Sequence, residues 1–181
     1  MLLFKCLCCC RLQVTVEPTE RLVRCYYTTK PTPLVEAHPF TESHWDSLRD
    51  IRVLLQFLRH GCNQRKLRLF ACACARRVLS FQPTAIAFSV LEHAEQLAEG
   101  CGSEVSVNTL KTEAATSPTA AWNEIESNAF WAVYATLSSD AWESAYCAAT
   151  SALEAVNDPE AEQRIQIGLL RDIVGHPFPV R

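Results

Sequence analysis

The sequence predicts an all-α protein, a compact bundle of five to seven helices with an irregular N-terminal extension. Three observations favour this class. The 181 residues include only five glycines, while alanine is abundant, and alanine costs least in a helix whereas glycine costs much more. Apolar residues after Phe40 recur at three- and four-residue spacings, as in helices with one buried face. The chain is 49% hydrophobic and 20% charged, which is ordinary for a globular protein and excludes disorder.

The first 40 residues have a different pattern from the rest. Leu12–Val16 and Leu22–Tyr27 alternate weakly and are rich in β-branched and aromatic residues, which predicts short strands or a hairpin. Three prolines then predict a linker, because proline disfavours helix just before it: Pro31, Pro33 and Pro39. We expect an N-terminal extension over residues 1–40 that is weakly structured or forms short strands, a helical domain over 41–178 and a tail over 179–181.

The first helices of the domain begin at residues that favour an N-cap. Thr41 predicts a short helix with Trp45, and Asp50 predicts a second whose apolar face comprises Ile51, Leu54, Leu55 and Leu58. Asn63 opens a third, with an apolar stripe of Leu67, Phe70, Ala71, Cys74 and Val78. Thr84 caps a fourth that reaches Glu99, and Ser103 or Ser106 opens a weaker one around Leu110 to Ala115.

The longest helical pattern covers residues 119–156. Trp122, Ile125, Ala129, Val133 and Leu137 share one face, and we expect Phe130, Trp131 and Tyr134 to widen it, so that this helix is buried on several sides. Ser138-Ser139-Asp140 predicts a break, after which a helix buries Tyr146 or Cys147, Thr150 and Leu153. Asp158-Pro159 starts the last helix, whose predicted apolar face is Ile165, Leu169, Leu170, Ile173 and Val174.

Three segments together resemble a family of uncharacterised proteins that is expanded in planctomycete bacteria. They are Thr41-Glu-Ser-His-Trp45, then Leu55-Gln-Phe-Leu-Arg-His60 running into Arg65-Lys-Leu-Arg-Leu-Phe-Ala-Cys-Ala-Cys-Ala-Arg-Arg77, and last Leu169-Leu-Arg-Asp-Ile-Val-Gly-His-Pro-Phe178. The family reads similarly to T-E-x-x-W, R-K-L-R-L-F-A-C-A-C-C-R-R and L-L-R-D-I-F-G-N-P-F. The resemblance implies an α-helical, cytosolic bacterial protein, and it implies no reaction. The chain departs from the pattern at Ala75, Val174 and His176.

Charge is distributed unevenly along the chain. The net charge is -3, but residues 1–77 carry +7 and residues 78–181 carry -10, and Lys111 is the only lysine or arginine between Val78 and Gln163. The sharpest feature is a set of cations on and just before the third helix, a possible face for an anionic partner: Arg59, Arg65, Lys66, Arg68, Arg76 and Arg77. They favour either phosphate binding or pairing with the acidic second half, and the acidic overall charge favours pairing.

Other chemistry has weak support in the sequence. Cys72 and Cys74 point about 200° apart on a helix, so both cannot ligate one ion. The chain has no glycine-rich phosphate loop, no G-x-S-x-G and no H-E-x-x-H. We therefore predict no catalytic, cofactor-binding or metal-binding residues. Helical spacing indicates that the four tryptophans pack in the core, although they could line a groove.

We conclude from the sequence that the protein is a non-catalytic protein-interaction or regulatory module with a helical surface. The alternative is a nucleic-acid-binding protein that uses the basic helix over residues 65–77. Ten cysteines in apolar or crowded contexts indicate a reducing cytoplasm rather than a disulfide scaffold, and no apolar run reaches the roughly 18 residues that a membrane span needs. The oligomeric state is left open.

Overall fold

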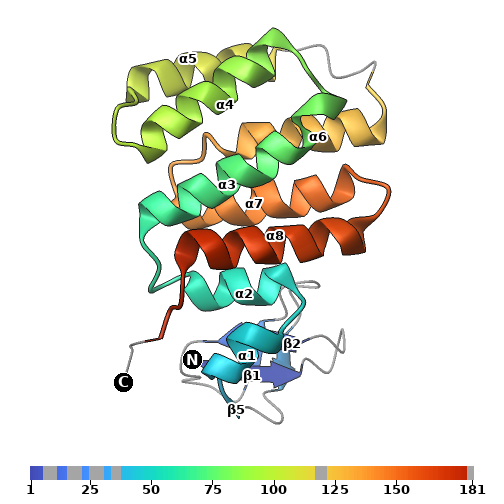
Figure 1. Ribbon diagram of the computed structural model, residues 1–181. Coiled ribbons are helices and arrows are strands. Elements are labelled where there is room, and N and C mark those ends of the chain that lie inside the picture. Colours follow the sequence, from blue (N-terminus) through green and yellow to red (C-terminus); the bar gives the residue numbers. More distant parts are fainter. Residues whose placement is uncertain (6–11, 16–21, 25–30, 34–37, 117–121, 179–181) are drawn as a thin grey trace. The chain divides into compact units, whose positions relative to one another are not determined.

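The computed structural model describes residues 1–5, 12–15, 22–24, 31–33, 38–116 and 122–178. These residues form eight α-helices and five short strands, and their contacts divide the chain into two compact units, Met1–Gly61 and Cys62–Arg181 (Figure 1). The predicted all-α class is confirmed, and the described residues form eight helices rather than the predicted five to seven. The predicted tail over 179–181 and the start of the 119–156 pattern lie outside the described residues.

Short strands occupy the beginning of the first unit. β1 (Leu2–Lys5) pairs antiparallel with β2 (Leu12–Thr15) and β5 (His38–Pro39), and β3 (Leu22–Arg24) pairs antiparallel with β4 (Pro31–Pro33). The strands expected from Leu12 and Leu22 are present, but they do not pair with each other as a hairpin. The predicted linker at Pro31 and Pro33 is wrong, because these prolines belong to a two-stranded sheet. Each of its strands is an edge, where a residue without an N–H is tolerated.

Two helices complete the first unit. α1 (Glu42–Ser47) begins after Thr41, which forms a capping box with His44. α2 (Ile51–Leu58) begins after Asp50, whose side chain accepts a hydrogen bond from the Arg52 backbone N–H at 2.9 Å. The four residues of its predicted apolar face are all buried, as expected: Ile51, Leu54, Leu55 and Leu58.

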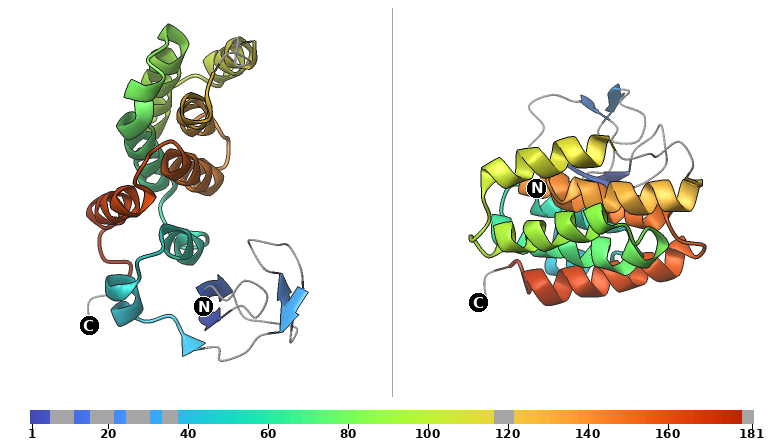
Figure 2. Two further views of the ribbon diagram at one scale, coloured as in Figure 1. Left: turned by 90° about the vertical axis from the view of Figure 1, so that its right-hand side faces the viewer. Right: turned by 90° about the horizontal axis from the view of Figure 1, so that it is seen from above.

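The second unit consists of helices in two layers, with α3 in contact with four others. Its elements are α3 (Gln64–Val78), the 3₁₀ turn η1 (Leu79–Phe81), α4 (Ala85–Ala98), α5 (Glu104–Ala115), α6 (Glu124–Ala135), α7 (Ala141–Glu154) and α8 (Pro159–Val174). Figure 2 shows α4, α3 and α8 in one layer and α5, α6 and α7 in the other. α3 packs on α4, α6, α7 and α8, and its predicted apolar stripe is buried throughout.

Side-chain caps fix where most of these helices start. Asn63 accepts a hydrogen bond from the Arg65 N–H at 2.8 Å, and Asp158 accepts one from the Ala161 N–H at 2.9 Å. α6 begins after Asn123, which forms a capping box with Glu126. This cap is not among the predicted helix starts. Each such cap satisfies a backbone N–H that has no partner inside the helix.

The interface of α7 with α3 and α6 is built from alanines. Four of them have no solvent exposure: Ala145, Ala148, Ala149 and Ala152. The predicted face is correct for Leu153 but wrong for Tyr146, Cys147 and Thr150, which are only half-buried. The small side chains point inward because α7 is covered by α3, α6 and α8, and small residues let helix backbones approach closely.

The buried face of α8 also differs from the prediction. Leu170 and Val174 are buried as expected, but Ile165 is 42% exposed, and Glu162 and Gln166 lie in the interior instead. Compared with the predicted face, the buried face of α8 is shifted toward Glu162 and Gln166. These two residues have hydrogen-bond partners on α3 and α7. A buried polar group is tolerated when it is paired, so the polarity of these residues misled the prediction.

Candidate binding groove

The basic residues of α3 bind the acidic second half of the chain. Three of its arginines form ion pairs, Arg65 with Glu99, Arg76 with Glu95 and Arg77 with Glu162. The Lys66 ammonium donates to the Val174 carbonyl at 2.7 Å. The sixth predicted residue, Arg59, is the C-cap residue of α2 and belongs to the first unit. For the cations of α3, the arrangement corresponds to the alternative in which they pair with the acidic second half of the chain.

Arg68 holds the turn between α6 and α7. Its two terminal nitrogens donate to the carbonyl oxygens of Ser138 and Ser139 at 2.9 and 2.7 Å. Hydrogen bonds from a charged donor are stronger than those between neutral groups. The Ser138 hydroxyl in turn lies 2.7 Å from a carboxylate oxygen of Glu143 and donates to it. Arg68 therefore positions a turn that carries one end of a groove.

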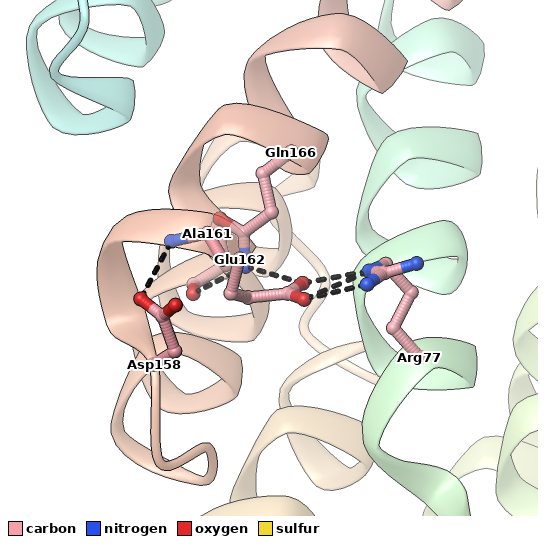
Figure 3. A network of polar contacts seen from close by, with 6 residues as sticks. Arg77, Asp158, Ala161, Glu162 and Gln166 are labelled. Atoms are coloured by element: carbon pink, nitrogen blue, oxygen red, sulfur yellow. Dashed lines mark hydrogen bonds and ion pairs between the residues drawn. The ribbon is translucent and has the colours of Figure 1, made fainter.

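The ion pair between Arg77 and Glu162 is the most buried of the three. Two guanidinium nitrogens of Arg77 donate to the Glu162 carboxylate at 2.8–2.9 Å, and Glu162 is only 5% exposed (Figure 3). Hydrogen bonding to Glu162 raises the pKa of Arg77. The Gln166 amide nitrogen donates to the Ala149 carbonyl at 3.1 Å. These contacts join α3, α7 and α8.

The two cysteines of α3 are buried on different sides of the helix. Burial raises the pKa of the Cys72 thiol to about 12, with a further contribution from Glu95, and burial raises the pKa of Cys74 as well. Neutral thiols are poor nucleophiles and poor metal ligands. Among the described residues, no three His, Cys, Asp or Glu side chains come together as a metal site.

A groove crosses the layer formed by α5, α6 and α7, and we call it the aromatic groove. Its cavity has a volume of about 460 Å³. Helix α5 contributes Lys111, and the remaining wall residues come from α6, α7 and the turn between them: Trp131, Tyr134, Ala135, Ser138, Glu143, Cys147 and Ser151. The three helices lie side by side in the left view of Figure 2, so residues from all three can face one ligand.

An exposed aromatic pair forms one wall of the aromatic groove. Trp131 is 50% exposed, and its ring meets that of Tyr134 edge to face, with centroids 5.4 Å apart and planes at 87°. The buried ring of Phe130 lies behind both, with centroids 6.2 and 6.3 Å away. The expectation that Trp131 packs in the core is therefore wrong. Residues two apart on a helix point about 200° apart, which places Trp131 opposite the buried Ala129 and Val133.

The charged residues of the groove are Glu143 and Lys111. The Glu143 carboxylate is exposed and accepts the Ser138 hydrogen bond. Burial raises the pKa of Cys147, and the nearby Glu143 raises it further, so this thiol stays protonated near neutral pH. The groove thus offers an aromatic face, a carboxylate and an ammonium group, and its cysteine is not activated as a nucleophile.

A second cavity, of about 400 Å³, lies between α4 and α5. Most of its wall residues have polar side chains, among them Glu92, His93 and Glu113. The His93 ring nitrogen Nε2 lies 3.1 Å from the Ser103 carbonyl oxygen, a contact that holds the start of α5. No aromatic residue other than His93 lines this cavity, and its side chains suggest no specific chemistry. We therefore regard the aromatic groove as the stronger candidate.

Comparisons of the chain with family models, curated proteins and solved structures find no match. The resemblance to the planctomycete family stays a prediction. Among the described helices, none has the length and apolar character needed to cross a membrane. The geometry of the groove is thus the main guide to function.

Proposed function

We propose that the protein is a non-catalytic interaction module that binds a positively charged segment of another protein in the aromatic groove. The observation that carries this proposal is Trp131, a large aromatic residue that is half-exposed at the wall of a cavity. Tryptophan is enriched at protein interfaces and among their energetically dominant residues. Burying its exposed half on a partner would release apolar surface from water.

Charge indicates the chemistry of the partner. Residues 104–154, which form α5, α6 and α7, contain seven Asp or Glu residues and one lysine. A negative surface attracts a basic segment and speeds its association. The face of a tryptophan ring also attracts ammonium and guanidinium groups. A lysine or arginine side chain that lies on Trp131 near Glu143 would use both effects.

The nucleic-acid alternative has less support. Each of the five cations on α3 already donates to a carboxylate or a carbonyl of the same chain. Phosphate groups would have to compete with these partners, and the opposite layer is acidic. Binding to generic duplex or single-stranded nucleic acid at low salt, lost on combining Arg65→Ala with Arg68→Ala, would favour this alternative.

The cellular setting is a further part of the proposal. Five cysteines of the described helices and turns have free thiols, and two of them are buried in α3. Free thiols are typical of a reducing compartment. We therefore place the protein in the cytoplasm of a bacterium, in line with the family that its three segments resemble.

Peptide binding tests the proposed function directly. We expect a short capped peptide containing arginine and lysine to bind the full chain, with an affinity that falls as salt screens the charges. Trp131→Ala should weaken binding by about threefold to thirtyfold, because it removes the cation–π contact. The measurement is fluorescence anisotropy of the labelled peptide.

Phe88→Ala supplies the matched control. Phe88 is an aromatic residue on α4 with 52% exposure, and it does not line the aromatic groove. Its loss should leave the affinity unchanged. Equal effects of the two substitutions, or equal binding of a neutral peptide of the same length, would contradict the proposal.

A further inference from the structure

The aromatic groove contains two opposite charges that do not pair with each other. Lys111 on α5 and Glu143 on α7 both line the cavity, and no ion pair joins them. Side chains of opposite charge beside one cavity, but held on different helices, each retain the capacity to bind a ligand group. This observation deepens the proposed function and rests on it.

Lys111 is unusual in its surroundings. It is the only lysine or arginine between Val78 and Gln163, and its ammonium group takes part in no hydrogen bond or ion pair within the part of the chain that the structure describes. The cations of α3 behave differently, because each of them has a partner in the chain. A half-buried, unpartnered ammonium group at a cavity wall attracts an anionic group.

Glu143 supplies the opposite charge at the α7 side of the groove. One of its carboxylate oxygens accepts the Ser138 hydroxyl hydrogen bond, and Arg68 fixes the backbone of that serine. A carboxylate held in this way can accept further hydrogen bonds from a cation, since each oxygen has two acceptor positions. The aromatic wall of Trp131 and Tyr134 belongs to the same cavity.

We infer that the aromatic groove selects an amphoteric anchor, a cationic side chain accompanied by a carboxylate in the same short segment. The cation lies against Trp131 and Glu143, and the carboxylate binds Lys111. A segment with cations alone would place one of them near Lys111, where like charges repel. Lys111 is therefore a specificity-determining residue, and a basic partner binds more tightly when an acidic residue accompanies its anchoring cation.

Two capped peptides of equal length test this inference on the full chain. One carries an arginine and a glutamate a few residues apart, and the other carries the arginine and a glutamine. We expect the amphoteric peptide to bind the unchanged protein about two- to fivefold more tightly, which is the effect of one partly exposed ion pair. Lys111→Gln should abolish this preference, and Lys111→Glu should reverse it.

Matched charge changes outside the groove serve as controls. Arg164→Gln removes a cation from the exposed surface of α8, and Glu160→Gln removes an anion from the first turn of the same helix. Both should preserve the preference for the amphoteric peptide. Glu143→Gln keeps an acceptor for the Ser138 hydroxyl but removes the negative charge. It should therefore weaken the binding of both peptides by the same factor.

The outcomes separate the two proposals. Equal binding of both peptides to the unchanged protein, combined with a loss on Trp131→Ala, would overturn the amphoteric anchor and leave the proposed function standing. Failure of both peptides to bind would overturn both. A preference that survives Lys111→Gln would show that Lys111 is not its source.

Discussion

At the scale of single residues, Glu162 shows how a polar side chain directs the packing of a helix. It is 5% exposed, and it accepts hydrogen bonds from Arg77 and from the buried Gln166. Ionised groups in such surroundings are tolerated only with a partner. The pairing explains why α8 turns this face inward although apolar residues are available elsewhere on it.

We expect Glu162→Ala to lower the free energy of unfolding by about 2–3 kcal/mol, because Arg77 loses its charged partner in a partly buried position. Glu99→Ala is the matched control, since the Arg65–Glu99 pair is more than half-exposed on both sides and exposed pairs contribute at most about 1 kcal/mol. Urea denaturation measures both. Equal losses would show that burial of the Arg77 pair has no energetic consequence.

The buried thiol of Cys72 should make the folded state less stable as the pH rises into the alkaline range. Burial raises its pKa to about 12 from an ordinary value of 9.0. The unfolded thiol loses its proton above about pH 9 while the folded thiol keeps it, so the unfolded state is increasingly favoured as the pH rises. By about pH 10.5 this should lower the free energy of unfolding by about 2 kcal/mol.

Comparison with Cys72→Ala isolates this contribution, because other groups titrate in the same range. Urea denaturation at a series of pH values should give a shallower loss of stability in the variant. Identical slopes for the two proteins would refute the assignment to Cys72.

At the scale of the helices, the close packing of α3 and α7 depends on small side chains. Ala145, Ala148, Ala149 and Ala152 leave no exposed surface on the inner face of α7. Phe70, Ala71 and Cys74 of α3 are equally buried. Because interiors are close-packed, the interface has little room for added volume.

Ala148→Leu should therefore destabilise the protein by about 1–3 kcal/mol through overpacking. Ala115→Leu, at an exposed position near the end of α5, is the control and should change stability by less than about 0.5 kcal/mol. Thermal unfolding followed by circular dichroism compares the variants. An unchanged stability of Ala148→Leu would show that the interface of α3 with α7 is packed less closely than the structure indicates.

Helix starts and apolar stripes of aliphatic residues could be predicted from the sequence, because they depend on local chemistry. Asp50, Asn63, Thr84, Asp140 and Asp158 cap helices as expected. The inner faces of α7 and α8 could not be predicted in this way, because they depend on tertiary contacts. The alanines of α7 are buried by neighbouring helices, and Glu162 of α8 is buried because Arg77 pairs with it. The sequence leaves a groove lined by tryptophan open as the weaker alternative, and the position of Trp131 opposite Ala129 on the helix is the signal that favours it for this residue.

At the scale of the whole chain, charge is divided between an N-terminal half with +7 and a C-terminal half with -10. Within the second unit, the cations of α3 find their partners on α4, α8 and the turn before α7. The layer of α5, α6 and α7 keeps an acidic surplus together with Trp131. The division thus gives the fold its ion pairs on one side and leaves an acidic surplus on the other.

The long separation in sequence between Arg77 and its partner Glu162 has a consequence during protein synthesis. Arg77 and Glu162 are 85 residues apart, so at about 5–20 residues per second a nascent chain exposes the arginine for about 4–17 seconds before the glutamate is translated. The residues made up to Arg77 carry a net charge of +7, and the acidic residues that follow reduce this surplus to zero by Asp140. Arg77 thus lacks the carboxylate that it binds in the folded chain until the last helix has been made, whereas Arg65 and Arg76 have their partners much earlier.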